Sequence, residues 1–350
     1  AAAVRCELAD GNGLLPLCVA DRTFARAVDF RRFLQRVLPD HLPAVPKSDP
    51  LARVQLPPSV PLSDELQRRF PAASAELLSG RPAALAELPI DHGVAPSAIC
   101  GGESAGRSQL RTFITERLPQ YLALRNHPDE DGTSGLAPYL HFGHVSAHEA
   151  FHALACAERW SPDRLGSGAT GGREGWWGMS DSAEAWLDQL VTWRELGYNS
   201  CFGREDFDQF DALPDWARET LAAHAADPRE VTYPLEDFAA GRTHDPLWNA
   251  AQHQLVCEGR MHNYLRMLWG KKILQWSASP REALRVMIEL NDRYALDGED
   301  PNSYSGICWV LGRYDRPWGP KRPIFGTIRY MTSESTARKL RVKQYLARWQ

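Results

Sequence analysis

The sequence lacks any segment suited to crossing a membrane, because no apolar run approaches the roughly 20 residues that a bilayer requires. Its N-terminus shows no basic region followed by an apolar stretch, so we expect no secretory signal peptide. The seven cysteines include no C-x-x-C pair, which argues against zinc and iron–sulfur sites. An odd number of scattered thiols favours a reducing compartment. We therefore expect a cytoplasmic protein that holds no metal and contacts no membrane.

Several common catalytic signatures are also missing. The sequence has no Walker-type phosphate loop, no H-E-x-x-H and no G-x-S-x-G motif. Its histidines are isolated, and His141, His144 and His262 fit structural roles better than catalytic ones. Because these motifs are absent, the sequence gives no support for a P-loop nucleotidase, a zinc protease or a serine hydrolase.

What the sequence does contain is helical periodicity. From about residue 64 onward apolar residues recur at helical spacing, and strand-like alternation is scarce. Hydrophobic residues make up 43% of the chain and charged residues 24%, as in ordinary globular domains, which excludes wholesale disorder. We therefore expect a mainly α protein.

The N-terminal part contains a single β-to-α step. Residues 3–18 predict a strand, a turn and a short apolar continuation, and residues 20–38 predict an amphipathic helix that ends before a proline. A complete doubly wound domain needs several β-α-β units of about 30 residues each. We expect residues 1–38 to be the remnant of an α/β, Rossmann-like domain, 39–63 a proline-rich linker and 64–350 a helical domain. The chain begins with alanine, and we expect a fragment or a processed product.

Charge is distributed unevenly along the chain. Residues 301–350 contain ten Lys and Arg residues against Asp315 and Glu334, a balance of +8. Since the net charge is −4, the first 300 residues carry −12. Such asymmetry suggests a basic face on an acidic protein. A solvated basic helix over 333–349 explains it equally well, and charge alone favours that simpler interpretation.

Helix boundary signals are clearest in two regions. Residues 183–199 predict one helix on which Gln189 and Trp193 face the same side. The other region predicts three helices: the first opens at Asp245–Pro246 and ends at Gly259, the second spans His262–Trp276, and the third spans residues 280–292.

Twelve tryptophans are unusual for this length, and two lie on the predicted helix ending at residue 276. Trp269 and Trp276 are seven residues apart, which is two helical turns or about 10 Å. Two indoles at this spacing suit an electron relay leading out from a buried cofactor. From spacing alone, a core stripe of large residues is the stronger interpretation.

Residues 291–306 are too polar for a simple core and too rich in apolar side chains for a linker, so they predict a site loop. In the segment that follows, Trp309 and Trp318 alternate with Arg313 and Arg316. Aromatic faces interleaved with arginines suit an extruded base and its flanking phosphates.

Three further features leave two interpretations open. Residues 133–143 place hydroxyls before an apolar helix, which suits either an anion site or a helix cap. Arg266 and Asp297 are either a buried pair beside a cofactor ring or an ordinary surface pair. Residues 165–178 predict a mobile glycine-rich loop, whose tryptophans either anchor a surface or fasten the loop to the core.

Taken together, these segments resemble the class II cyclobutane pyrimidine dimer photolyases of the photolyase/cryptochrome family. The matching motifs are TSGLAPYLHFG (133–143), WLDQLVTWRELGYN (186–199), THDPLWNAAQ (243–252), GRMHNYLRMLWGKKILQW (259–276), LNDRYALDGEDPNSYSG (290–306) and RYDRPWG (313–319). The resemblance is strong over roughly 100–350. It implies an all-helical FAD-binding domain, with the α/β remnant belonging to an antenna domain. It also implies light-driven electron transfer from reduced FADH− to a pyrimidine dimer flipped out of damaged double-stranded DNA.

The resemblance also implies roles for particular residues. FAD is expected to contact Tyr121, Thr133, Ser134 and Leu136 at its phosphates and ribose, Arg266 and Asp297 beside the ring, and Asn291 at N5. The electron relay is expected to comprise Trp269, Trp276 and Trp248. The lesion pocket is expected to lie between Trp193 and Trp309, with Met267 toward the flavin, and the DNA contacts are expected to be Arg125, Arg316 and Trp318.

The chain departs from the family pattern at two places. Gln189 stands where we expect a glutamate in class II enzymes, which leaves open a preference for cyclobutane dimers or for (6-4) lesions. Most of the antenna domain is absent, so we expect no antenna chromophore site. Two alternatives stay open: a cryptochrome-like FAD photoreceptor without repair activity, and a fragment too truncated to fold. We expect a monomer.

Overall fold

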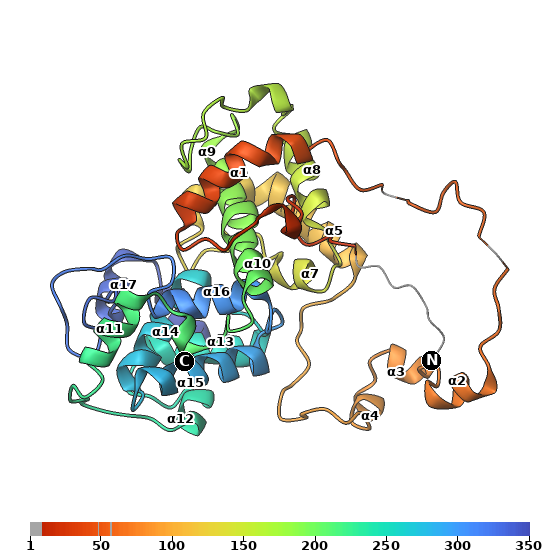
Figure 1. Ribbon diagram of the computed structural model, residues 1–350. Coiled ribbons are helices and arrows are strands. Elements are labelled where there is room, and N and C mark those ends of the chain that lie inside the picture. The colour runs from red at the N-terminus through yellow and green to blue at the C-terminus, as the bar shows by residue number, and fades with distance from the viewer. Residues whose placement is uncertain (1–8, 48, 57) are drawn as a thin grey trace. The chain divides into compact units, whose positions relative to one another are not determined.

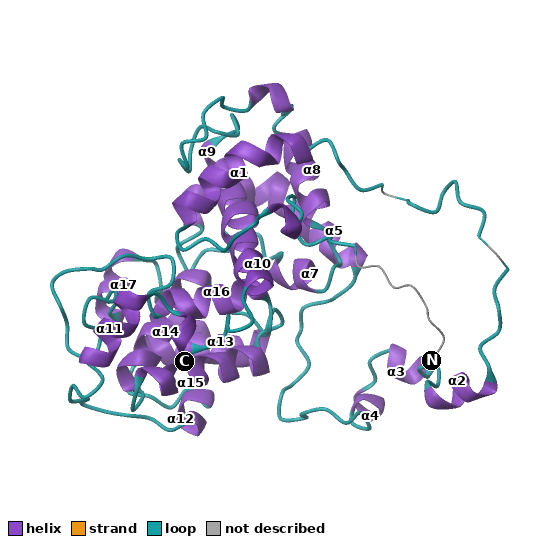
Figure 2. Ribbon diagram, in the orientation of Figure 1, coloured by secondary structure: helices purple, strands orange, loops and turns teal. Residues whose placement is uncertain are grey.

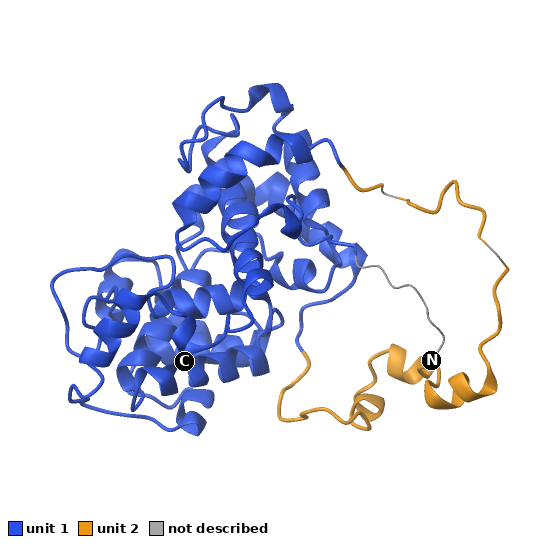
Figure 3. Ribbon diagram, in the orientation of Figure 1, with its two compact units in different colours: residues 1–44, 97–350 blue, residues 45–96 orange. Residues whose placement is uncertain are grey.

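The computed structural model describes residues 9–47, 49–56 and 58–350, and every regular element there is helical (Figures 1 and 2). Within this part the only β-type pairing is an isolated bridge between Arg322 and Gly326. The expectation of a mainly α protein is confirmed. The chain forms two compact units, one comprising residues 1–44 and 97–350 and the other residues 45–96 (Figure 3).

The smaller unit contains three short helices: α2 (Asp64–Arg69), α3 (Ala75–Leu78) and α4 (Pro82–Leu85). Ser63 and Ser74 cap the first two by accepting a hydrogen bond from a backbone N–H. None of these helices buries a residue. The domain boundaries expected at residues 38 and 63 stay predictions.

The N-terminal segment of the larger unit ends in a helix, α1 (Ala27–His41), preceded by a short turn η1 (Leu17–Val19). The predicted strand precedes the turn at residues 10–13, and nearly all of it, residues 3–8, lies outside the described residues, while the described positions that follow form no strand. The Rossmann-like remnant therefore stays a prediction. Contrary to expectation, α1 continues through Pro39, because Leu42 N donates to Leu38 O and closes the last turn.

The first hydrophobic core of the larger unit packs α1 against the helices of the middle of the chain. These are α5 (Glu103–Thr112), η2 (Phe113–Arg117), η3 (Leu118–Gln120), α6 (Tyr121–Leu124), α7 (Ala137–His141), α8 (Ala147–Ala157), η4 (Pro162–Arg164), α9 (Asp181–Leu187), η5 (Asp188–Trp193) and α10 (Arg194–Gly203). The helix predicted over 183–199 is present. It is longer than predicted, and its middle segment η5 is a π-helix, a form frequent at functional sites.

The second core gathers the C-terminal helices. These are η6 (Phe210–Ala212), α11 (Asp215–Ala223), α12 (Leu235–Ala239), α13 (Pro246–Glu258), α14 (Asn263–Trp276), α15 (Pro280–Tyr294), α16 (Pro301–Val310), α17 (Ser333–Lys339) and α18 (Lys343–Trp349). Asp245 caps α13 and Gly259 ends it in the left-handed conformation, as the sequence predicts.

The two cores meet where α10 packs against α16. A Cβ atom at Gly197 would lie 2.9 Å from Pro301 O and 3.2 Å from Asn302 Cα. Only glycine therefore permits this approach of the two backbones. The contact holds Trp193, just before α10, and Trp309, near the end of α16, in fixed positions relative to each other.

Two C-terminal elements differ from the sequence-based expectation. The predicted site loop over 291–306 is shorter, because Asp300 caps α16 and Pro301 opens it. The predicted basic helix over 333–349 is two short helices, because Arg341 leaves helical pairing. Its N–H donates to His127 Nδ1, and its C=O accepts from Asp129 N.

Candidate functional site

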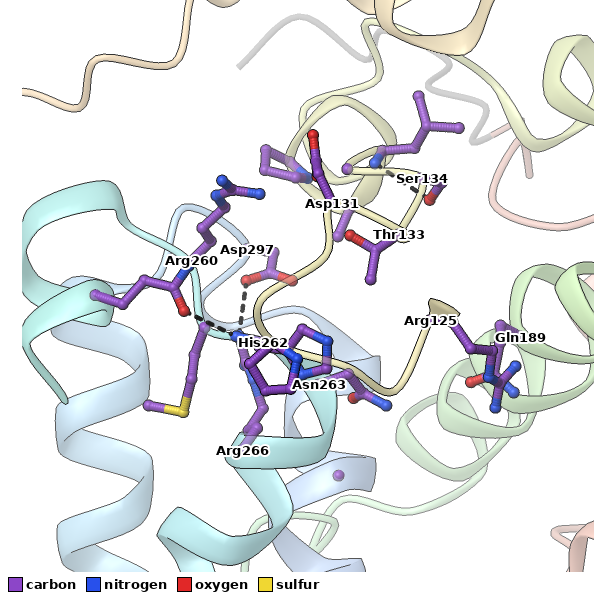
Figure 4. Close-up of a pocket in the computed structure, with 18 of the residues that line it drawn as sticks. Arg125, Asp131, Thr133, Ser134, Gln189, Arg260, His262, Asn263, Arg266 and Asp297 are labelled. Atoms are coloured by element: carbon purple, nitrogen blue, oxygen red, sulfur yellow. Dashed lines mark hydrogen bonds and ion pairs between the residues drawn. The ribbon is translucent and has the colours of Figure 1, made fainter. Parts of the chain in front are cut away.

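A large cavity opens in the larger unit, bordered by residues of both cores (Figure 4). Its volume is about 830 Å³. Ligand and cofactor pockets typically enclose about 300–1,000 Å³, so this cavity is large enough for an extended cofactor. Most of the site residues predicted from the sequence line it: Arg125, Thr133, Ser134, Leu136, Gln189, Trp193, Arg266, Met267, Asp297 and Trp309.

One wall of the cavity comes from the π-helix η5. Asp188, Gln189 and Trp193 all line the cavity from this segment. Trp193 Nε1 donates to Asp188 Oδ2 at 3.2 Å, and the indole meets Tyr314 edge-on with ring centroids 6.5 Å apart. The π-helix thus places the ring of Trp193 and the amide of Gln189 at the same cavity.

A second aromatic residue of the cavity lining is Trp309 on α16. Lys271 Nζ lies 5.1 Å from the centre of its ring, and Arg329 Cζ lies 5.5 Å from it. Lys271 is buried and donates to Val310 O at 2.5 Å. Burial lowers the pKa of this lysine to about 7. Two basic side chains therefore lie against the Trp309 ring.

A charged network borders another part of the cavity. Arg266 Nη2 lies 3.7 Å from Asp297 Oδ1 (Figure 4), and Arg266 Nη1 donates to Asn291 Oδ1 at 2.7 Å. Both charged side chains are less than one-fifth exposed. Of the two interpretations that the sequence left open, the structure favours the first: the pair is formed and is largely shielded from solvent. Asn291 itself lies behind Arg266 and does not line the cavity.

The segment before α7 contributes hydroxyls and backbone groups. Thr133 and Ser134 line the cavity, and Gln109 Nε2 fixes the turn by donating to Ser134 O at 2.6 Å. Arg117, which also lines the cavity, pairs with Asp131 at 2.5 Å. Tyr121, also predicted as a site residue, is buried beside Arg125 and does not line the cavity.

His262, for which the sequence analysis favoured a structural role over a catalytic one, also borders the cavity. Its side chain lines the cavity, and its two ring nitrogens are buried and form no hydrogen bond of normal geometry. Burial lowers the pKa of His262 to about 4, so the ring is neutral near pH 7. Buried polar atoms are nearly always paired, so two buried nitrogens without a well-formed hydrogen bond, on a residue beside the cavity, are compatible with a polar ligand there. The available donors and hydroxyls fit a phosphate-bearing cofactor such as FAD.

The C-terminal helix α18 is a second part of the site that the sequence analysis missed. Gln344, Tyr345 and Arg348 line the cavity. Tyr345 OH donates to Gln254 Oε1 at 2.8 Å, and the same oxygen accepts from His262 N. The sequence of this C-terminal segment indicated only a basic helix, and no local signal in it predicted that α18 would line the cavity.

The three predicted relay tryptophans are buried in the second core and outside the cavity lining. Trp248 stacks parallel to Trp269 with ring centroids 6.5 Å apart, and it meets Trp276 edge-on at 5.9 Å. Trp276 in turn contacts Tyr233 and His244 at 5.7 and 5.0 Å. Trp248 therefore connects the two indoles that the sequence spacing had paired directly.

Arg316 and Trp318, predicted DNA contacts, do not line the cavity. They stack on each other, with Arg316 Cζ 4.4 Å from the ring centre. Arg329 covers the same ring at 3.9 Å and pairs with Asp315 at 2.9 Å. The Trp318 N–H donates to Asp315 Oδ1 at 3.0 Å. This ordered basic and aromatic cluster adjoins Trp309 through Arg329.

Comparison with known proteins gives a consistent picture, although no protein-family model matches the chain. Over 245 residues, 70% of this chain, it is 42% identical to a deoxyribodipyrimidine photo-lyase of Potorous tridactylus. Over 253 residues, 72% of the chain, it is 38% identical to that of Methanothermobacter thermautotrophicus. Over 238 residues, 67% of the chain, it is 42% identical to that of Oryza sativa subsp. japonica.

The chain resembles deoxyribodipyrimidine photo-lyases. It spans about half the length of these curated relatives, covering 42%, 52% and 43% of them respectively. A class III photolyase structure from Agrobacterium tumefaciens matches with a TM-score of 0.62 and 18% identity, over 97% of this chain and 61% of that one. A cryptochrome structure from Synechocystis matches with a TM-score of 0.52 and 18% identity, over 75% of this chain and 48% of that one. The helical fold is therefore that of the photolyase and cryptochrome structures.

Two negative findings concern the described residues alone. None of their helices is long and apolar enough to cross a membrane. Nor do they bring together three or more His, Cys, Asp or Glu side chains in a group that could hold a metal ion.

Proposed function

We propose that this chain forms the FAD- and DNA-binding part of a class II deoxyribodipyrimidine photo-lyase, which uses light to split cyclobutane pyrimidine dimers. The observation that carries this proposal is the identity of 38–42% to three relatives of that name across about 70% of the chain. The class II assignment rests on the motifs at 186–199 and 259–276, which supply both aromatic and charged residues of the cavity.

The cavity residues fit the cofactor that this function requires. Reduced FAD, when bound, supplies the light absorption and the electron for splitting the dimer. Thr133, Ser134 and Leu136 would hold its phosphates and ribose, and the imidazole of His262 would form a hydrogen bond with it. Arg266 and Asp297 would flank the ring system, with Asn291 fixing Arg266 from behind. Tyr121 does not line the cavity, and it would contribute to cofactor binding by packing its ring against Arg125, which does.

The substrate side of the cavity has the character expected for a flipped dinucleotide. Trp193 and Trp309 offer two aromatic faces, and Met267 lines the cavity with them. Base–aromatic stacking contributes about 1–3 kcal/mol per base. Arg125 at the cavity, with Arg316 and Trp318 outside it, would contact the DNA backbone and the gap left by the flipped bases.

The buried tryptophans suit photoreduction of the cofactor. Trp269, Trp248 and Trp276 form a chain of ring contacts that continues to Tyr233, which is half-buried, and to the exposed His244. Such a chain would carry an electron inward from the surface along aromatic groups in contact. Its residues would not take part in splitting the dimer.

Gln189 is the residue at which lesion preference would be decided. Its amide lies in the cavity with Trp193. An amide donates and accepts hydrogen bonds but shares no proton, unlike a protonated carboxyl group. A preference for (6-4) lesions is therefore the second candidate function, and binding of matched oligonucleotides carrying either lesion would separate the two.

A survival assay tests the proposed function in cells. The chain would be produced in a bacterial strain without photolyase, which would be irradiated with ultraviolet light and then kept in blue light or in darkness. The proposal predicts higher survival in blue light only, with the loss of thymine dimers from the DNA. Equal survival in both conditions, from a soluble protein with bound flavin, would contradict it and favour a photoreceptor.

A further inference from the structure

The orientation of Trp193 depends on a carboxylate five residues earlier. Residues five apart on an α-helix point about 140° apart, whereas the wider turn of a π-helix brings them much closer to the same side. In η5 this geometry lets Trp193 Nε1 donate to Asp188 Oδ2 at 3.2 Å. The Asp188 side chain is only 9% exposed. A fixed, buried acceptor limits rotation of the indole, so the position of Asp188 sets the angle of this cavity wall.

Asp188 is itself held by Arg31 of α1, which is distant in the sequence. Arg31 Nε and Nη2 donate to Asp188 Oδ1 at 2.9 and 2.7 Å, and Nη1 donates to Gly171 O at 3.0 Å. The Arg31 side chain is 8% exposed. A buried ion pair with its donors engaged is geometrically strict, and removing one partner leaves an uncompensated charge.

The same face of α1 also fixes the glycine-rich loop 165–178. Gln35 donates to Gly172 O at 3.0 Å and accepts from Gly171 N at 2.7 Å. Gly171 has a φ of +79°, and a Cβ there would lie 2.6 Å from Val28 O, so only glycine lets the loop approach α1. The loop predicted to be mobile is thus fastened to α1, and α1 is held in a defined place relative to Asp188.

We propose that Arg31 is a positioning residue for the substrate pocket: it fixes Asp188 and, through Asp188, the Trp193 ring on which a flipped base would stack. Arg31 does not line the cavity, so it acts on the substrate only through these neighbours. The inference rests on the proposed function, which assigns the lesion to this wall. It extends the substrate site to an N-terminal helix that no resemblance or motif assigned to it.

A double-mutant cycle tests the proposal. Four proteins are compared in the dark: wild type, Arg31→Gln, Trp193→Phe and the double variant. The dissociation constant is measured for an oligonucleotide with one thymine dimer and for the same oligonucleotide undamaged, and flavin content is measured in parallel. Phenylalanine at position 193 keeps a ring but has no N–H to donate, which removes the link through which Arg31 acts.

The proposal predicts that Arg31→Gln lowers the preference for damaged DNA by about tenfold, a typical effect of disturbed base stacking. Flavin content and affinity for undamaged DNA should stay unchanged. On the Trp193→Phe background, Arg31→Gln should have little further effect. Arg36→Gln is the matched control, because it removes the same charge from an exposed position of α1 and should leave all three measurements unchanged.

Equal effects of Arg31→Gln on both backgrounds would overturn the proposal. So would a parallel loss of flavin and of undamaged-DNA binding, because that pattern marks a purely structural role. If Arg31→Gln does not fold, Arg31→Lys replaces it, since lysine keeps the charge and loses the two-donor contact. The proposal predicts that Arg31→Lys also lowers the preference for damaged DNA, but by less than Arg31→Gln would. A wild type without preference for damaged DNA would refute the proposed function, and the inference with it.

Discussion

At the scale of single residues, Trp309 is the side chain on which recognition of a flipped base most directly depends. It lines the cavity, as Trp193 does, and its ring contacts Lys271 and Arg329. We expect Trp309→Ala to weaken binding of thymine-dimer DNA by about 1–3 kcal/mol, the usual value of base–aromatic stacking. Titration of damaged and undamaged oligonucleotides in the dark measures this difference. Phe202→Ala, which removes an exposed aromatic ring outside the cavity lining, is the control, and unchanged affinity in Trp309→Ala would contradict the assignment.

A second prediction concerns His262 and the affinity for the flavin cofactor. The His262 side chain lines the cavity, and its buried ring nitrogens form no hydrogen bond of normal geometry, so we expect a bound flavin nucleotide to form one with this ring. We expect His262→Phe to lower flavin affinity by roughly tenfold, the value of a lost hydrogen bond to a charged group. Fluorescence of released flavin upon dilution measures it. His152→Phe, on the exposed face of α8, should retain wild-type affinity.

At the scale of elements, the packing of α13 against α14 makes Trp248 the centre of the aromatic chain. Since it alone of the three contacts both other tryptophans, we expect Trp248→Phe to slow photoreduction of the flavin more than Trp276→Phe does. Both variants should repair normally after chemical reduction. Absorption spectroscopy under blue light with an external reductant follows the photoreduction. A larger effect of Trp276→Phe, or loss of repair in prereduced protein, would contradict this order.

Lys271 lies at the contact between α14 and α16, and it leads to a prediction about how the stability of the fold depends on pH. Lys271 has a pKa of about 7 in the folded protein and about 10.5 when unfolded, because burial disfavours its charge. Between these values the unfolded chain binds more protons, so this group makes stability increase as pH rises from 7 toward 10.5. The contribution amounts to about 2 kcal/mol between pH 7 and pH 9.

Urea unfolding at pH 7 and pH 9 measures this contribution as the difference between wild type and Lys271→Met. The variant should gain less stability than wild type across this interval. Lys343→Met, at an exposed position of α18, should behave as wild type does. The same pH response in Lys271→Met as in wild type would show that the buried amine is not the group responsible.

Local sequence signals, such as capping residues, predicted where single helices begin and end. They did not predict irregularities within or between helices. Asp245 and Gly259 mark the ends of α13 because capping depends on a few neighbouring residues. The π-helix η5 was not predicted, since its cause is tertiary packing rather than a residue pattern. The break between α17 and α18 likewise depends on hydrogen bonds from residue 341 to a distant loop.

At the scale of the whole molecule, the site is assembled from segments far apart in the sequence. The motif resemblance named most of the residues that line the cavity, because long motifs carry their own spacing. It did not indicate His262, α18 or Arg31, whose roles depend on which surfaces the two cores bring together. The C-terminal charge excess is also clarified in part, since Arg316 and Arg329 belong to an ordered cluster with Trp318.

The central claim, light-driven repair by bound flavin, is tested most directly on a defined substrate. The purified protein would be photoreduced and mixed with an oligonucleotide carrying one cyclobutane thymine dimer. Recovery of absorbance near the thymine band would be followed under blue light and in darkness. We predict recovery in the light and none in the dark. Absence of recovery in the light, from protein that holds reducible FAD and binds the oligonucleotide, would contradict the claim.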